Sequence, residues 1–157
     1  MPLIVGVNSY LSADEADEYF SDSLYTDAWD TATAAQRAAA LIMAARAIDA
    51  QDYRGNITSE SQAMAWPRDG VYDREGRPLD PLEVPQMIGC AQAECALAIL
   101  REDPAEARDP SMKRMKAGSV EVEYRAGQSA TALRGSVLAM IKPFLRDYSG
   151  ASARLAP

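Results

Sequence analysis

The feature that most constrains the fold is an alanine-rich run, TATAAQRAAALIMAARAIDAQ, at positions 31–51. Thr33 followed by Gln36 forms the pattern of a capping box, and nearly every later residue favours helix. Apolar residues recur at intervals of three and four, which gives a helix one narrow apolar stripe: Ala38, Leu41, Ala45 and Ile48. Alanine on both flanks of this stripe permits close contact with neighbouring helices. The run therefore predicts a long helix inside a helical packing.

Two further segments show helical periodicity. Ser12 and Glu15 form a second capping-box pattern, which predicts the start of a helix. Its apolar face is expected to comprise Ala16, Tyr19, Phe20 and Leu24. Residues 81–100 predict another helix, with Pro85 in its first turn, where the missing N–H costs nothing. The apolar face of this helix is expected to comprise Val84, Ile88, Ala91, Cys95 and Ile99.

The C-terminal part carries one strand pattern and one helix pattern. SVEVEY at 119–124 alternates apolar and acidic residues, as a half-buried strand does, and no second strand follows it. Residues 129–148 predict the last helix, which Pro143 kinks or ends. The apolar stripe of this helix comprises Leu133, Val137, Ile141 and Leu145. The tail at 149–157 has no core pattern and is expected to fray unless a partner holds it.

These elements predict a mainly α fold. We expect a small bundle of about four helices, a mid-chain charged loop or hairpin, one isolated β-strand arm and an extended C-terminal tail. A chain of 157 residues suits one domain, and no linker divides it. The expected helical core spans about residues 8–102, the strand arm about 118–125, and the C-terminal helix and tail about 130–157.

Composition and motifs argue against several functions. The net charge of −7 does not suit a protein that holds nucleic acid mainly by neutralising phosphates. The chain has no histidine, no phosphate-binding glycine loop, no nucleophile elbow and no metal motif, so we expect no enzyme, cofactor or metal. No apolar run approaches the roughly 18 residues of a membrane helix, and the start does not fit a secretion signal. We therefore expect a soluble, intracellular protein.

The most unusual segment is MAWPRDGVYDREGRPLD at positions 64–80. It follows TSESQAMAW at 58–66, which predicts a short helix capped by Thr58 or Ser59. An active-site loop, a nucleic-acid contact and an assembly contact are the three interpretations of the loop. Its aromatic residues and arginines are interleaved as in proteins that stack bases, but acidic residues alternate with them and the charges nearly cancel. We expect Trp66 and Pro67 to anchor the loop and a turn at residues 73–76 to project it.

A second charged segment is KRMK at positions 113–116, the one net-basic island of the chain. Four residues are too few to hold DNA alone. The cluster suits a salt bridge to an acidic neighbour, or a contact with phosphate or with an acidic rim on another protein.

The order of these motifs resembles a family of tailed-phage proteins. The matching features are NSYLSADEADEYF, Trp29, ALIMAARAIDA followed by YRG, then AWPRDGVYDREGRPL, VP and AQAECAL. They run from Asn8 to Leu100, and the resemblance extends more loosely through SVEVEY and VLAMIKPFLRDY. Members are often labelled DnaT-like single-stranded-DNA-binding proteins, and they are similar to head–tail connector, adaptor or head-completion proteins.

The resemblance implies a structural virion protein that forms a twelve-fold ring beneath the portal. Such a ring extends the DNA channel and provides the surface to which the tail attaches. The implied partners are further copies of the chain, the portal protein, and tail-terminator, stopper, tail or nozzle proteins. Double-stranded DNA would pass without specific binding, and an acidic channel wall suits that passage. The implied location is the virion neck, and the host cytoplasm during assembly.

Candidate contacts to neighbouring subunits or the portal lie on the loop, the strand and the C-terminal end. They are Trp66, Arg68, Tyr72, Arg74, Arg77, Val120, Val122, Tyr124, Phe144, Leu145, Arg154 and Leu155. In this hypothesis the exposed strand pairs with another chain through its main-chain groups. The alternative hypothesis is a DnaT-like replication accessory protein that binds single-stranded DNA through Trp66, Tyr72 and the loop arginines.

Overall fold

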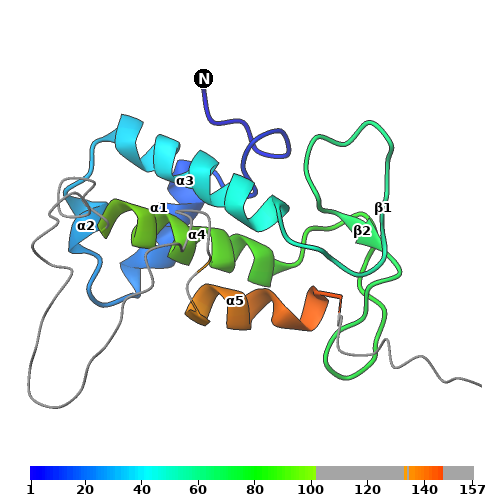
Figure 1. The fold of residues 1–157 in the computed structure, drawn as a ribbon. Coiled ribbons are helices and arrows are strands. Elements are labelled where there is room, and N and C mark those ends of the chain that lie inside the picture. The colour runs from blue at the N-terminus through cyan, green and yellow to red at the C-terminus, as the bar shows by residue number, and fades with distance from the viewer. Residues whose placement is uncertain (102–132, 134, 147–157) are drawn as a thin grey trace, which may run out of the picture.

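The computed structural model describes residues 1–101, 133 and 135–146 of the chain (Figure 1). Its helices are α1 (Ala13–Ser21), α2 (Asp27–Asp30), α3 (Ala34–Asp49), α4 (Gln86–Arg101) and α5 (Gly135–Ile141), which continues into the 3-10 turn η3 (Lys142–Phe144). Two short strands, β1 (Asn56–Ile57) and β2 (Arg68–Asp69), pair in antiparallel register. The prediction of a mainly α fold is confirmed.

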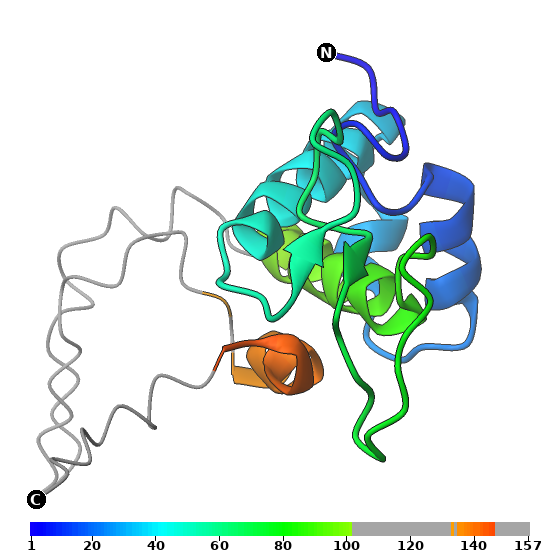
Figure 2. The same ribbon diagram turned by 90° about the vertical axis from the view of Figure 1, so that its right-hand side faces the viewer.

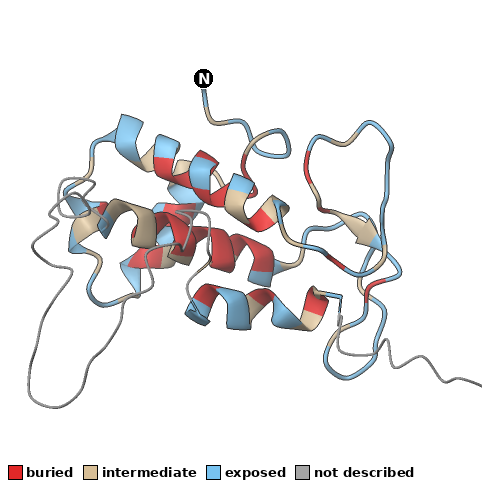
Figure 3. Cartoon of the chain, in the orientation of Figure 1, coloured by how far each residue is buried: buried red, intermediate tan, exposed pale blue. Residues whose placement is uncertain are grey.

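Helix α4 lies between α3 and α5, as both views show (Figures 1 and 2). The faces of α3 and α4 that meet are almost entirely buried (Figure 3). Alanines make up much of this contact: Ala40, Ala44 and Ala45 on α3, and Ala91, Ala93 and Ala96 on α4. Side chains of one carbon let the two helix backbones approach closely, and this agrees with the apolar stripe expected on the alanine-rich helix.

Both predicted capping boxes are present. The backbone N–H of Glu15 donates to Ser12 Oγ at 3.2 Å, and the N–H of Ser12 donates to Glu15 Oε2 at 2.7 Å. At α3, the N–H of Gln36 donates to Thr33 Oγ1 at 3.2 Å, and the N–H of Thr33 donates to Gln36 Oε1 at 2.9 Å. Each box satisfies helix N–H groups that have no partner within the helix, so both helix starts follow from local sequence.

Several boundaries differ from the predictions. Helix α1 ends at Ser21, and Leu24, expected on its apolar face, is exposed. Residues 58–66 form turns and bends instead of a helix, and α4 begins after Pro85. Helix α2 was not expected; it carries the buried Trp29, whose ring centroid lies 4.9 Å from that of Phe20. The predicted strand at 119–124, the basic cluster at 113–116 and the tail at 149–157 lie outside the described residues.

One polar side chain lies at the centre of the core. The amide of Gln92 on α4 is fully buried, and its Nε2 donates to Ser9 Oγ at 2.7 Å and to the carbonyl of Leu41 on α3 at 2.9 Å. Its Oε1 accepts from the backbone N–H of Tyr10 at 2.9 Å and of Leu11 at 3.2 Å. One side chain thus joins α4 to α3 and to the segment that precedes α1.

A glycine on α4 also contacts the segment before α1. A Cβ built at Gly89 would lie 2.9 Å from Leu11 Cδ2, so the Leu11 side chain would have to shift to accept a larger residue. Glycine at this position therefore lets Leu11 lie directly on the helix. The hydrogen bonds of Gln92 and the contact between Leu11 and Gly89 together place the N-terminal segment against the first turns of α4.

The Gln92 contacts lead to a stability prediction. Gln92→Met keeps the side-chain volume but leaves the hydroxyl of Ser9, the carbonyl of Leu41 and two backbone N–H groups without these partners. We expect the free energy of unfolding to fall by about 2–4 kcal/mol in urea titrations followed by circular dichroism. The control Gln86→Met, on the exposed first turn of α4, should change it by less than about 0.5 kcal/mol. Equal losses in the two variants would contradict the assigned role.

Candidate interaction surface

The loop at 64–80 is anchored in the core at its root. The side chain of Trp66 is 3% exposed and lies between two aromatic rings, with centroids 5.3 Å from Tyr53 and 5.4 Å from Phe144. Tyr53 precedes β1 and Phe144 ends η3, so the cluster joins three parts of the chain that are distant in sequence. The root of the loop therefore moves with the helical body.

A polar network fixes the backbone beside this cluster. The hydroxyl of Tyr10 donates to Asp49 Oδ1 and accepts from the N–H of Trp66 at 3.3 Å. Asp49 Oδ2 accepts from the N–H of Ala65 at 3.3 Å. The last residue of α3 thus holds both the N-terminal segment and the loop root.

Desolvation changes the protonation of this network. Burial raises the pKa of the half-buried Asp49 carboxyl above its usual 3.8, although the hydrogen bonds from Tyr10 and Ala65 oppose the change. Burial, together with the bond to Asp49, also raises the pKa of Tyr10, so its hydroxyl keeps its proton and remains a donor. The pair acts as a structural link between the helices and the loop.

Arg68 faces inward. Its Nε donates to the carbonyl of Arg54 at 2.8 Å, its Nη1 to the carbonyl of Ala65 at 3.1 Å and its Nη2 to the carbonyl of Gly55 at 2.9 Å. The guanidinium thereby clamps the chain before β1 to the chain before β2. Gly55 has φ +68° and a Cβ there would lie 2.1 Å from the carbonyl oxygen of Asp69, so the close pairing of the strands requires glycine.

Beyond β2, residues 71–79 form a hairpin that projects past the helices (Figure 2). The N–H of Leu79 donates to the carbonyl of Val71 at 2.9 Å, and the N–H of Asp73 donates to the carbonyl of Arg77, also at 2.9 Å. The N–H of Gly76 closes the tip on the carbonyl of Asp73 at 3.1 Å. Val71 at the base is buried. The hairpin is therefore an ordered projection rather than a loose loop.

The tip neutralises one of its arginines. Arg77 Nε lies 2.7 Å from Asp73 Oδ2, and Arg77 Nη2 lies 3.3 Å from Glu75 Oε2. The backbone N–H of Arg77, with the guanidinium of the same residue, lowers the pKa of the partly exposed Asp73 carboxyl. Tyr72 and Arg74 are exposed, and Arg74 makes no ion pair with any described residue. These two side chains are the ones that the tip offers to a partner.

The structure shows where the described candidate contact residues lie. Trp66 and Phe144 are buried within the chain, and Arg68 is engaged by three carbonyls, so these three side chains support the fold rather than the surface. Leu145 is half-buried and bridges to Tyr53 in antiparallel fashion. Five candidates lie outside the described residues: Val120, Val122, Tyr124, Arg154 and Leu155.

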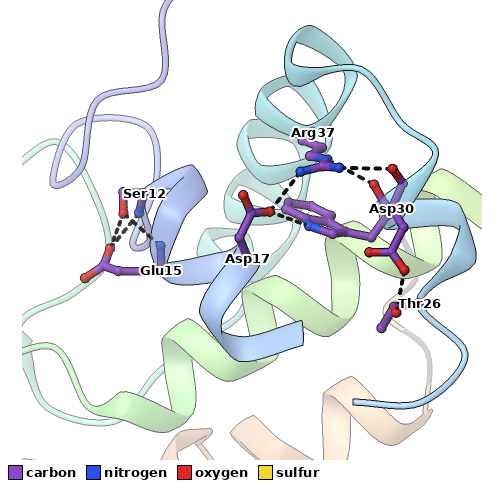
Figure 4. A network of polar contacts seen from close by, with 7 residues as sticks. Ser12, Glu15, Asp17, Thr26, Asp30 and Arg37 are labelled. Carbon is purple, nitrogen blue, oxygen red and sulfur yellow. Dashed lines mark hydrogen bonds and ion pairs between the residues drawn. The ribbon is translucent and has the colours of Figure 1, made fainter. Parts of the chain in front are cut away.

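Acidic residues gather at the N-terminal end of the chain. Residues 1–36 hold seven of the 23 acidic residues and none of the 16 basic ones, so the remainder carries 16 of each and is formally neutral. The first basic residue is Arg37, whose Nη1 lies 3.0 Å from Asp17 Oδ1 (Figure 4). The same carboxylate oxygen accepts a hydrogen bond from Trp29 Nε1 at 2.7 Å. Arg37 further donates to the carbonyls of Trp29 and Asp30, and so it ties α1, α2 and α3 together.

Within the described part of the chain, the other six acidic residues of this region have no basic partner: Asp14, Glu15, Glu18, Asp22, Asp27 and Asp30. The net charge of the protein is therefore concentrated on α1 and α2 and their flanking turns. A surface of this kind repels polyanions and attracts basic partners.

Sequence reasoning missed the residues that position the loop, namely Gln92, Tyr10 and Asp49. The available signal was a glutamine at an otherwise apolar position of the 86–101 helix. A polar residue on a buried face requires partners, and here those partners lie some 50 and 80 residues away in sequence.

No group of three or more His, Cys, Asp or Glu side chains in the described residues is arranged to hold a metal ion. Among the same residues, no helix is both long enough and apolar enough to cross a membrane. The fold and the surface define a small helical domain with a rigid projecting hairpin and an acidic end.

Comparison with protein-family models identifies the family of this domain. The chain belongs to the family described as "Putative DnaT-like ssDNA binding protein", whose model matches residues 2–156. Neither the curated proteins nor the solved structures gave a match to the chain.

The raised pKa of Asp49 leads to a prediction on pH. Because the folded state holds this proton more tightly than the unfolded chain, the stabilising contribution of protonated Asp49 is present below about pH 4. It is lost as the pH rises through the folded-state pKa. Asp49→Asn stays neutral, so its free energy of unfolding should rise relative to wild type as the pH increases above about 4. Denaturant titrations across this range measure the difference, and a flat difference would contradict the effect.

Proposed function

We propose that the protein is a structural assembly protein of a tailed-phage particle, a head–tail connector or adaptor. In this role copies of the chain form a ring below the portal, which extends the DNA channel and provides the attachment surface for the tail. The role requires no catalysis and no cofactor. The observation that carries the proposal is the projecting hairpin, whose root is fixed in the core while its tip presents Tyr72 and Arg74.

A fixed projection suits contact between subunits. Binding loses less conformational entropy when the contacting segment is ordered before the partner arrives. The hairpin meets this condition through its internal backbone hydrogen bonds and the buried Trp66 at its root. The mixed charge of its tip favours a defined register with a neighbour over attachment to a polyanion.

The charge distribution supports the same role. A channel that DNA must cross works best when its wall does not hold phosphates, and the formal charge of −7 meets this requirement. The acidic α1–α2 region would face the passing DNA or a basic partner. The sequence resemblance to connector proteins spans residues 8–100, which include both the hairpin and the acidic region.

The proposed partners are other copies of the chain, the portal protein, and tail-terminator, stopper, tail or nozzle proteins. The protein would be found in the neck of the virion, and in the host cytoplasm before assembly. Twelve copies per ring are the number that the resemblance implies.

A second candidate function is single-stranded-DNA binding, which the family description names. Its supporting observation is the exposed pair Tyr72 and Arg74, an aromatic ring and a cation at the tip of the hairpin. The other groups considered for this role are engaged within the protein: Trp66 is buried, Arg68 binds carbonyls and Arg77 pairs with acids. Two residues interleaved with Asp73 and Glu75 form a weaker DNA site than the sequence alone indicated.

Charge reversal at the hairpin separates assembly from folding. Arg74→Glu should weaken ring assembly by about tenfold or more and leave the free energy of unfolding within about 0.5 kcal/mol of wild type. Arg68→Glu should instead lower the free energy of unfolding by about 2–3 kcal/mol, because a carboxylate cannot donate to the three carbonyls. Sedimentation velocity and electron microscopy of portal-bearing particles measure assembly, and denaturant titrations measure stability. If Arg74→Glu protein assembles into rings as well as wild type, the hairpin tip makes no contact between subunits.

A DNA titration tests the second candidate. Because both tryptophans are buried, the readout should be the anisotropy of a labelled oligonucleotide rather than protein fluorescence. Under the connector role we expect no saturable binding at an ionic strength on the order of 10 mM, where electrostatic binding is strongest. Salt-sensitive binding that is lost in Tyr72→Ala and Arg74→Ala would favour the DNA-binding function instead.

A further inference from the structure

A groove separates α1 from the first turns of α4. It has a volume of about 740 Å³, and its walls come from the segment before α1, from α1 itself and from residues 84–90. Its lining mixes polar and apolar side chains, and Leu11, Tyr19, Val84 and Cys90 contribute to the apolar part. None of these four is fully buried, so the groove offers apolar surface that no described part of the chain covers.

The rim of this groove is acidic. Glu15, Glu18 and Asp22 line it from α1 and its C-terminal end, and all three are exposed. They belong to the N-terminal region that holds the entire net charge of the protein. Within the described residues none of them has a basic partner. A groove that combines apolar side chains with these three carboxylates suits a segment that combines apolar and basic side chains.

We propose that this groove receives the segment Met112–Lys116 of a neighbouring copy of the chain. The segment lies outside the described residues, and its sequence, MKRMK, places two methionines among three basic residues. Lys113 and Arg114 are the chain's one pair of adjacent basic residues. Methionine side chains are flexible and fill irregular apolar surfaces, while the three cations match the three carboxylates of the rim.

The length of chain around this segment permits it to reach a second copy. Met112 follows the end of α4 at Arg101 by 11 residues, and an extended chain of that length spans up to roughly 35 Å. Helix α4 itself is only about 24 Å long. The contact joins different surfaces on the two copies, and such a heterologous contact forms a ring when the rotation between copies closes. The inference rests on the proposed ring and identifies one of its contacts.

Disulfide trapping tests the contact, with two variants that each carry one introduced cysteine and keep the buried Cys95. In a Cys90→Ser background, the Val84→Cys protein places a thiol on the groove wall, and the Met115→Cys protein places one on the segment. Mixing the two full-length proteins under mild oxidation should give a covalent dimer at least about tenfold faster than the matched mixture of Ile57→Cys with Met115→Cys. Ile57 is a suitable control because it is 46% exposed, against 38% for Val84, and does not line the groove.

The trapping outcomes are decisive in both directions. Equal rates with Val84→Cys and Ile57→Cys, or no dimer in either mixture, would overturn the inference. A further control is a chain that carries both Val84→Cys and Met115→Cys. If this chain forms only an internal disulfide and the mixture gives no dimer, the groove binds the segment of its own chain, and the inference is equally overturned.

Charge exchange supplies the second test. Glu18→Lys with Asp22→Lys should slow the trapping by about tenfold, whereas the control pair Glu60→Lys with Asp69→Lys, exposed and outside the groove, should not. Adding Lys113→Glu and Arg114→Glu to the partner protein should restore the rate. An unaffected rate with the groove pair, or no restoration, would contradict the assigned charge pairing.

Attachment to portal-bearing particles separates the two proposals. If the Glu18→Lys, Asp22→Lys protein attaches at the normal copy number, the groove contact is wrong and the connector role stands. If wild-type protein does not attach, the connector role is wrong whatever the trapping shows.

Discussion

The buried amide of Gln92 is the interaction on which the other contacts depend. It bonds α4 to the carbonyl of Leu41 on α3 and to the N-terminal segment through Ser9, Tyr10 and Leu11. That placement directs the Tyr10 hydroxyl to Asp49, and Asp49 and Tyr10 together hold the backbone at the root of the hairpin. Because a buried amide that loses its partners is costly, the network fixes the hairpin relative to the helices.

The arginines of the described chain serve the fold more than the surface. Arg37 joins three helices, Arg68 clamps the two strand segments, and Arg77 closes the hairpin tip. Each uses the rigid guanidinium fork to satisfy carbonyls or carboxylates. Because these cations are engaged internally, the acidic residues of α1 and α2 keep an unneutralised field. This arrangement argues for contacts with proteins over contacts with phosphates, and it agrees with the connector role better than with DNA binding.

The hairpin and the acidic groove are complementary kinds of contact surface. The hairpin is an ordered projection with an exposed ring and cation at its tip, and the groove is a recess of mixed polar and apolar lining with three carboxylates on its rim. In the proposed ring, neighbouring copies would meet through unlike surfaces of this kind. The family to which the chain belongs is described as "Putative DnaT-like ssDNA binding protein", and the assembly role is our proposal.

The sequence by itself determined the helix starts, the alanine-rich helix and the end of the last helix. The capping boxes at Ser12 and Thr33, the alanine-rich α3 and the end of α5 at Pro143 could each be predicted because their interactions join residues a few positions apart. Tertiary structure alone decided that Phe144 is buried, that Arg68 faces inward and that Trp29 packs against Phe20 from a short helix at residues 27–30. Those outcomes depend on partners distant in sequence, whose proximity no local pattern encodes. The same holds for Gln92, since a buried amide is satisfied only once three segments have met.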